Sequence, residues 1–367
     1  MKAIVRPIDL PPGRRVLVIS DIHGNLPLLK GLLGKAGFCR EDILIILGDI
    51  LERNEGSLDT LRYVMELSRQ YTVYTLLGNC DNLVGVFVDG GGEGDLDEKF
   101  FHRRWFRRLG EKSVLVKMAH LAGVPIEDPA DYPAAREAIA REFRPELEFL
   151  RALPHIYVNG DYLFVHGGVP REDRLEELEA FGCMKNDGFL DQGLSFRRWV
   201  VVGHWPVTLY RGDIASAKPI LLQDRHIASI DGGCTLKADG QLNALILPER
   251  PGGEFSWVAY DGFPVMTALE GQEASEDPVN IRWGRSRLEV LSEGPEFCRC
   301  RHLETGRELN VMTEYLRRDG EGVWCEDSTD YRLPVTAGER LSVVRQTSRG
   351  ALCKKAGVTG WYYGKLQ

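Results

Sequence analysis

Short apolar runs alternate with helix-like stretches in the N-terminal part of the chain. Apolar runs at 16–19, 43–47 and 72–77 each have the length of a buried strand. Between them, residues 26–37 and 58–70 carry leucines at helical spacing. The order strand, helix, strand, helix, strand predicts a βαβαβ unit, in which a parallel sheet lies between helices.

The pattern changes in the middle of the chain. Residues 95–153 are polar and helical in character, and we expect a helical insertion that covers one side of the core and caps the mouth of a site. From Tyr157 onward, short apolar runs end in Gly and Asp turns, which predicts a second sheet. A two-sheet α/β sandwich flanked by helices accommodates all these elements.

The C-terminal region has a third character. Residues 270–280 are polar and rich in turn formers, which indicates a linker between a domain at 1–270 and a second domain at 280–367. Short strands and many turns predict a small all-β barrel for the second domain. Its ending, Gly360-Trp361-Tyr362-Tyr363-Gly364, resembles the close of a bacterial SH3-like domain. Such a domain could bind a peptide, another protein or a cell-wall fragment, or could only extend the core.

Composition narrows the classes of function. A net charge of −8 argues against a protein that binds nucleic acid mainly by electrostatics. The cysteines form no Cys-x-x-Cys pair, so a zinc knuckle is not expected. No window approaches the roughly 18 uninterrupted apolar residues of a membrane span. We therefore expect no membrane partner and place the protein in the cytoplasm.

Five short motifs carry the candidate chemistry, and each follows an expected strand. They offer carboxylate, imidazole and amide ligands, a mixed set that suits two hard or borderline divalent cations a few ångströms apart. Two such cations can bind a phosphoryl group and lower the pKa of a water, so the motifs predict a two-metal phosphoester hydrolase. The motifs are Asp21-Ile22-His23-Gly24-Asn25, Gly48-Asp49-Ile50-Leu51-Glu52-Arg53, Gly78-Asn79-Cys80-Asp81, His166-Gly167-Gly168 and Gly203-His204.

These motifs resemble those of the calcineurin-like metallophosphoesterase superfamily over about residues 15–250. The His-Gly-Gly step is similar to the phosphoprotein phosphatase branch, which includes bacterial diadenosine tetraphosphate hydrolases. The resemblance implies two manganese, iron or zinc ions and a bridging hydroxide that attacks phosphorus in line. It also implies that Arg53 and Asn79 bind the substrate. The implied ligands are Asp21, His23 and Asp49 for the first ion, and Asp49, Asn79, His166 and His204 for the second.

The candidate catalytic residues are Cys80, Asp81, Glu52 and Arg53, and two of them depart from the family pattern. Cys80 stands where the family has a histidine that protonates the leaving oxygen, and Glu52 stands where it has that histidine's aspartate partner. A thiol is a possible acid but a weak hydrogen-bond donor. If Cys80 contributes only to packing, the alternative proton donors are His102, His120 and a water.

The departure at Cys80 has a consequence for the substrate. General acid catalysis is worth roughly 10²–10⁴-fold in rate. Its loss would slow alkyl phosphates most, because their leaving groups need a proton. Aryl phosphates, diesters with good leaving groups and phosphoanhydrides would suffer less.

The branch also has a second phosphate-binding arginine that this chain lacks at the corresponding place. Lys185 could substitute for it as a point charge, and Arg197 or Arg198 could reach the site. This departure weakens the case for a phosphoprotein substrate.

Three functions follow from these observations. The first is hydrolysis of a phosphomonoester, including phosphoserine or phosphothreonine in a protein. The second, suggested by Cys80, is hydrolysis of a phosphodiester or a dinucleoside polyphosphate. The third is a regulatory or binding protein with a weak site, against which the complete ligand set argues. The expected partner is thus a phosphorylated protein, small molecule or nucleotide.

Overall fold

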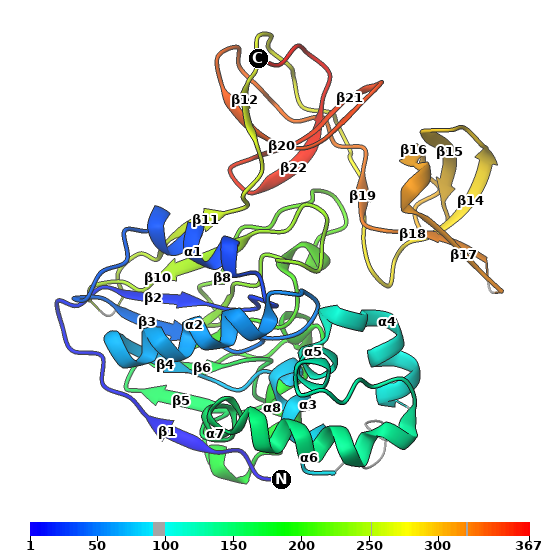
Figure 1. Cartoon of the computed structure of the whole chain (residues 1–367). Helices are drawn as coiled ribbons and strands as arrows, with labels where there is room; N and C mark the ends of the chain where they lie inside the picture. Colours follow the sequence, from blue (N-terminus) through cyan, green and yellow to red (C-terminus); the bar gives the residue numbers. More distant parts are fainter. Residues whose placement is uncertain (91–99, 251, 321) are drawn as a thin grey trace. The chain divides into compact units, whose positions relative to one another are not determined.

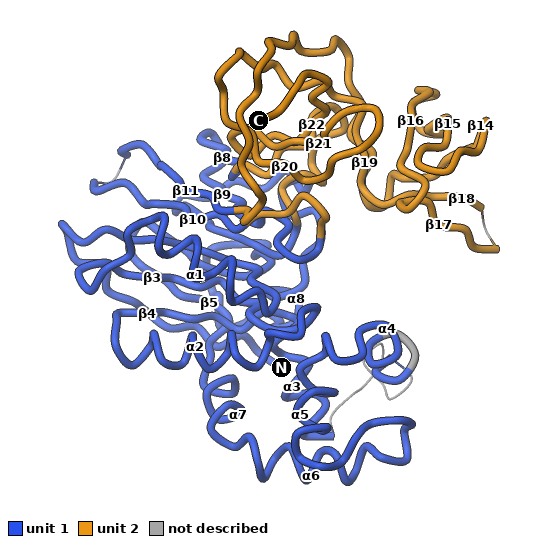
Figure 2. Tube along the Cα trace, turned by 45° about the horizontal axis from the view of Figure 1, so that its top comes forward, with its two compact units in different colours: residues 1–205, 219–236, 242–260 blue, residues 206–218, 237–241, 261–367 orange. Residues whose placement is uncertain are grey.

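The computed structural model describes residues 1–90, 100–250, 252–320 and 322–367. It divides the chain into two compact units, shown in different colours in Figure 2. The first unit comprises residues 1–205, 219–236 and 242–260, and the second comprises 206–218, 237–241 and 261–367.

The expected βαβαβ arrangement is present in the first unit (Figure 1). Strands β2, β3 and β4 are parallel neighbours, and β10 and β11 extend the sheet in antiparallel fashion to give the order β11-β10-β2-β3-β4. The bounds are Val16–Ile19 for β2, Ile43–Ile46 for β3, Thr72–Thr75 for β4, Leu242–Ile246 for β10, Ser256–Tyr260 for β11, Leu26–Lys35 for α1 and Ser57–Gln70 for α2.

The expected second sheet is also present and has the order β1-β5-β6-β7-β9-β8. Its central strands β6, β7 and β9 are parallel, so their carboxyl ends lie at one edge of the sheet. The bounds are Val5–Pro7 for β1, Ile156–Asn159 for β5, Tyr162–Val165 for β6, Trp199–Val202 for β7, Ile220–Leu222 for β8 and Ile227–Ser229 for β9.

Strand β2 is buried on both faces and contributes to two apolar clusters. Val16 and Val18 pack with residues of the second sheet such as Phe164, whereas Leu17 and Ile19 belong to the cluster that the helices cover. Successive side chains of a strand point to opposite faces, so a continuous apolar run is what a sheet buried on both faces requires.

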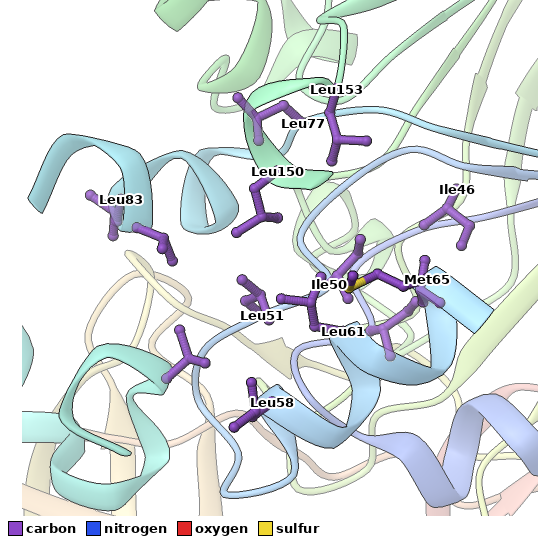
Figure 3. Packing of buried hydrophobic residues seen from close by; sticks show 14 of the residues in the cluster. Ile46, Ile50, Leu51, Leu58, Leu61, Met65, Leu77, Leu83, Leu150 and Leu153 are labelled. Carbon is purple, nitrogen blue, oxygen red and sulfur yellow. The ribbon is translucent and has the colours of Figure 1, made fainter. Parts of the chain in front are cut away.

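The helical cluster also anchors the loop after β3. Ile50 and Leu51 are fully buried, and Figure 3 shows them beside Leu58 and Leu61 of α2. Asp49, directly before them, is therefore held by an apolar anchor on its C-terminal side.

The expected insertion at 95–153 is helical over its described part, and residues 95–99 lie outside the described residues. Among the described helices, none is long and apolar enough to cross a membrane. The helices of this region and its flanks are α3 (Asn79–Val88), a π-helix (Phe100–Phe106), α4 (Arg107–Leu109), α5 (Val114–Leu121), α6 (Tyr132–Glu142), α7 (Arg144–Arg151) and α8 (Ala180–Met184).

The second unit contains the expected C-terminal strands, which pair in three sheets. The unit also takes in 206–218 and 237–241, which come from within the expected first domain. One sheet joins β12 (Val265–Thr267), β20 (Arg340–Thr347), β21 (Gly350–Lys355) and β22 (Val358–Tyr362); a second joins β13 (Asn280–Ile281) and β19 (Ser328–Thr329); the third joins β14 (Arg287–Ser292), β15 (Phe297–His302), β16 (Glu308–Met312), β17 (Leu316–Asp319) and β18 (Gly322–Cys325).

Candidate metal centre

The six candidate ligands all follow the carboxyl ends of strands in the first unit. Such positions at the ends of neighbouring parallel strands are where α/β sheets build their sites. Asp21 and His23 follow β2, Asp49 follows β3, Asn79 follows β4, His166 follows β6 and His204 follows β7.

The backbone at these positions is unusual. Eleven described non-glycine residues have a positive φ, and six of them belong to the predicted site. Left-handed backbone is unfavourable for such residues and concentrates where a function requires it. The six are Asp21 (φ 54°), His23 (φ 47°), Asp49 (φ 51°), Glu52 (φ 71°), Arg53 (φ 71°) and His204 (φ 66°).

The first candidate ligand group converges on His23. Its Nε2 lies 3.8 Å from Asp21 Oδ1 and 3.8 Å from Asp49 Oδ2. Its Nδ1 lies 3.2 Å from the carbonyl oxygen of Leu51, to which it donates. That hydrogen bond fixes the tautomer and leaves the lone pair of Nε2 for a cation.

The second group shares Asp49 with the first. His166 Nε2 lies 3.4 Å from Asp49 Oδ1 and 3.2 Å from Asn79 Oδ1. The other ring nitrogen of His166 lies 3.0 Å from the carbonyl oxygen of Leu47, which again leaves Nε2 for a cation. Ligand atoms of Asp49, His166 and His204 lie within 4.8 Å of one another. Asp49 therefore belongs to both candidate ligand groups.

Burial and neighbouring charges shift the pKa values of the candidate ligands. Burial lowers the pKa of His23 by disfavouring its charged form. Burial also opposes a charge on His166, but the facing carboxylates of Asp49 and Asp21 raise its pKa to about 9, so a cation that binds at Nε2 would displace a proton. For Asp49, burial is outweighed by the imidazoles of His166 and His23, which lower its pKa.

The donor set fits two divalent cations. Asp21 Oδ1 is buried and has no hydrogen-bond partner among the described residues, although a buried carboxylate oxygen normally has one. A cation bound beside it would satisfy this oxygen, and the set of carboxylate, amide and imidazole ligands suits divalent cations.

Glycines let the ligand loops approach one another closely. A Cβ on Gly78 would lie 2.2 Å from both the backbone nitrogen and Oδ1 of Asp49. A Cβ on Gly203 would lie 2.4 Å from Asp21 Oδ2. Asp21 Oδ2 in turn accepts a 2.9 Å hydrogen bond from the backbone N–H of His204. The glycines of these motifs thus give the ligands room.

Asp81 lies beneath the ligand loops. Its Oδ1 accepts hydrogen bonds of 3.0 Å each from the backbone N–H groups of Ile50 and Leu51, and its Oδ2 accepts one of 3.1 Å from Gly78. Both oxygens are thereby engaged, and Asp81 is buried. This geometry ties the loop after β3 to the loop after β4, a positioning role that the sequence does not reveal.

Glu52 faces the helical insertion. It accepts hydrogen bonds from Trp105 Nε1 (3.0 Å), Ser113 Oγ (3.1 Å) and the backbone N–H of Val114 (3.2 Å). Burial raises the pKa of Glu52 to about 8, against the opposing influence of these donors. Its neighbour Arg53 stacks on Trp105, with 5.5 Å between the guanidinium carbon and the ring centroid.

Cys80 lies among ligand atoms. Its thiol, the imidazole of His23 and the carboxylate of Asp49 have ligand atoms within 4.8 Å of one another. The Asn79 amide donates to Cys80 Sγ at 3.5 Å. Burial, followed by the charge of Asp49, raises the pKa of the Cys80 thiol well above its usual value. A thiol so shifted is a poor proton donor. Of the alternatives, His120 is exposed and contacts Glu111 at 3.2 Å.

The residues considered as a second phosphate clamp have other partners. The ammonium of Lys185 pairs with Asp187. Arg197 Nε lies 2.9 Å from Glu172 Oε1, and Arg198 Nε donates to the carbonyl oxygen of Gly160 at 3.2 Å.

Asp187 is a site residue that sequence reasoning missed. Its Oδ1 lies 2.7 Å from His204 Nε2 and so orients the imidazole. That hydrogen bond, together with the charge of Lys185, lowers the pKa of Asp187 to about 2. Trp105 is a second such residue. Neither carries a sequence pattern that would have identified it.

Comparison with known proteins identifies a matching family and several relatives. A family model described as calcineurin-like phosphoesterase matches residues 14–230. An asymmetrical bis(5'-nucleosyl)-tetraphosphatase of Bacillus velezensis is 24% identical over 260 residues, which cover 64% of this chain and 89% of that protein.

Other similar proteins match a shorter part of the chain or have a lower sequence identity. A symmetrical bis(5'-nucleosyl)-tetraphosphatase of Neisseria meningitidis is 28% identical over 163 residues, which cover 44% of this chain and 46% of that protein. The chain thus spans about half the length of that relative. A metallophosphoesterase structure from Sphaerobacter thermophilus aligns with a TM-score of 0.34 at 18% identity, over 67% of this chain and 88% of that one.

Proposed function

The chain belongs to the calcineurin-like phosphoesterases, and from that premise we propose that it hydrolyses a dinucleoside polyphosphate or a phosphodiester with a good leaving group. As a member of that family it is a hydrolase of phosphoester bonds. The observation that carries the proposal is the convergence of two ligand groups on the shared carboxylate of Asp49. Manganese, iron or zinc are the ions that we propose for the two groups.

Two divalent cations bound there would act as Lewis acids on a phosphoryl oxygen and would lower the pKa of a water. The protein's own residues do the rest. Backbone carbonyls engage the Nδ1 atoms of His23 and His166, so the Nε2 atom of each ring would be the one to hold an ion. We assign Arg53 to the phosphoryl oxygens, because its guanidinium is suited to bidentate binding and its buried Nε has no hydrogen-bond partner among the described residues.

The proposed substrate class follows from the missing acid. Cys80 is buried and a thiol is a weak hydrogen-bond donor, so it is poorly suited to protonate a leaving alkoxide. A nucleotide leaving from a phosphoanhydride needs no such proton. The names of the relatives, bis(5'-nucleosyl)-tetraphosphatases, support the same class.

A phosphomonoester, including phosphoserine or phosphothreonine, is the second candidate. The unpartnered Nε of Arg53 favours it, because a terminal phosphate offers oxygens for bidentate binding. The engaged ammonium of Lys185 argues for the first candidate, since a phosphoprotein would lack a second clamp.

A substrate panel tests the proposal. We expect the Mn²⁺-loaded protein to show a kcat/KM for diadenosine tetraphosphate or bis-p-nitrophenyl phosphate at least tenfold above that for a phosphoserine peptide. The Asp49→Asn variant, which weakens the bridging ligand, is the matched control and should lose all these activities. A preference for the phosphoserine peptide would favour the second candidate. Absence of metal-dependent hydrolysis in the wild type would refute both.

The finer expectations about the rest of the chain remain predictions. They are an SH3-like closure of the C-terminal strands, the domain boundary at 270–280 and the cytoplasmic placement. A crystal structure in which the C-terminal sheets stay open would contradict the first.

A further inference from the structure

We propose that Trp105 is a positioning residue, which holds the Arg53 guanidinium toward the phosphoryl group and so lets the helical insertion set the affinity of the site for phosphate. The inference rests on the proposed function, because it assigns Arg53 to the phosphoryl group. Trp105 acts through Glu52 and Arg53, both of which it contacts.

The first step concerns the backbone that carries Arg53. Glu52 and Arg53 are consecutive, and both have a φ of 71°. Left-handed backbone at a non-glycine residue persists only where its surroundings hold it. A pair of such residues in sequence needs contacts from outside its own loop.

The helical insertion supplies those contacts. The Glu52 side chain is fully buried, and its carboxyl group accepts hydrogen bonds from Trp105, Ser113 and Val114. All three donors lie in the described part of the insertion. The indole N–H of Trp105 donates to Oε2, whereas the other two donate to Oε1. Trp105 is therefore the partner of one specific oxygen of Glu52.

The same side chain contacts the guanidinium of Arg53. The distance of 5.5 Å from the guanidinium carbon to the Trp105 ring centroid is within the range of a cation–π interaction. Arg53 Nε is buried and has no hydrogen-bond partner among the described residues. A buried N–H without a partner is unusual, and a phosphate oxygen would satisfy it. Trp105 thus contacts an arginine whose buried Nε has a hydrogen bond to offer to an anion.

A second reading of Trp105 is a platform on which a nucleobase stacks. Its ring already stacks on Phe100, at 5.6 Å between centroids and an interplanar angle of 26°, in addition to its contact with Arg53. These contacts engage the ring within the protein. They favour a holding role over contact with the substrate.

The experiment measures phosphate binding as well as turnover, in the full-length Mn²⁺-loaded protein. Inorganic phosphate serves as the probe, and its inhibition constant is measured against bis-p-nitrophenyl phosphate. Trp105→Ala removes both contacts, whereas Trp105→Phe keeps an aromatic face and loses the N–H. Leu121→Ala, at an exposed position of the same insertion, is the control.

We expect Trp105→Ala to raise the inhibition constant of phosphate about tenfold and to raise KM more than it lowers kcat. Trp105→Phe should give an intermediate value, and Leu121→Ala should leave both constants unchanged. In an Arg53→Ala background, Trp105→Ala should have no further effect on the phosphate constant, because both changes remove the same interaction.

Two results would overturn the inference. One is an unchanged phosphate constant in Trp105→Phe and Trp105→Ala, with only kcat or stability reduced. The other is an equal loss in the wild-type and Arg53→Ala backgrounds. If Trp105→Ala does not fold, the Trp105→Phe comparison decides the question alone. Failure of the proposed function would look different, since the wild type would then show no metal-dependent hydrolysis.

Discussion

Replacement of Asp81 gives the sharpest test of how the site is held together. Asp81→Ala would leave three buried backbone N–H groups, those of Ile50, Leu51 and Gly78, without their acceptor. An unsatisfied buried donor costs about 1–3 kcal/mol. Partial relaxation and entry of water reduce this cost, so Asp81→Ala should lower the free energy of unfolding by about 3–6 kcal/mol in total. That is a large share of the roughly 5–15 kcal/mol by which a typical protein is stable.

Asp81→Asn should cost less, and the difference is informative. The Asn carbonyl oxygen can replace Oδ1 and accept from Ile50 and Leu51, but its amide group would then face the N–H of Gly78. Two hydrogen-bond donors would then face each other where one hydrogen bond stood, so we expect the free energy of unfolding to fall by about 1–3 kcal/mol. The control is Asp89→Ala, whose half-exposed carboxylate pairs with Arg151 and should contribute at most about 1 kcal/mol.

Hydrogen exchange at individual amides measures this effect locally. Since a tenfold change in protection corresponds to about 1.4 kcal/mol, Asp81→Ala should lower the protection of the Ile50, Leu51 and Gly78 amides by about two to four powers of ten. Asp81→Asn should lower it by about one to two, with the largest effect at Gly78. Protection within threefold of the wild type in both variants would refute the positioning role of Asp81.

Three further predictions concern neighbouring groups. Gly203→Ala should displace the carboxylate of Asp21 and weaken Mn²⁺ binding, measured by calorimetry, at least tenfold. Gly34→Ala is the control, because nothing lies within 4 Å of its added Cβ, and it should leave Mn²⁺ binding unchanged. Equal Mn²⁺ affinities of the two variants would contradict the role of Gly203. Cys80→Ala should change kcat by less than tenfold on aryl and alkyl substrates alike, and a selective loss on alkyl phosphates would restore Cys80 as the acid. The pKa of Glu52 is raised in the folded state to about 8, from an ordinary value of 4.5. Between these two pH values the carboxyl group ionises in the unfolded chain but stays protonated in the folded one, which favours unfolding. The free energy of unfolding of the wild type should therefore fall by a few kcal/mol as the pH rises through that range. Urea titrations at several pH values should show a smaller fall in Glu52→Gln, and equal slopes would show that Glu52 does not titrate there.

The strands that carry the ligands could be predicted from the sequence because local pattern determines them. The runs at 16–19 and 43–47 are apolar at every position, as strands buried on both faces require. Regular spacing then placed Asp21 and Asp49 at one edge of the sheet, where the structure has them.

The support of the site could not be predicted in the same way. Asp187 orients His204, and Trp105 contacts Arg53, through tertiary proximity that no periodicity encodes. The backbone contacts of Asp81 were hidden for a related reason: its position next to Cys80 suggested chemistry, whereas the structure shows its oxygens accepting from the backbone of two loops. The division of the C-terminal strands among separate sheets likewise depends on which strands pair, and alternation along a strand does not specify its neighbour.

The most direct test of the central claim is anomalous diffraction from crystals of the full-length protein grown with Mn²⁺. The account predicts two anomalous peaks about 3.5–4 Å apart, one beside His23 and one beside His166, with the carboxylate of Asp49 between them. Crystals with abundant Mn²⁺ that show no peak among these side chains, or a single peak remote from Asp49, would contradict it.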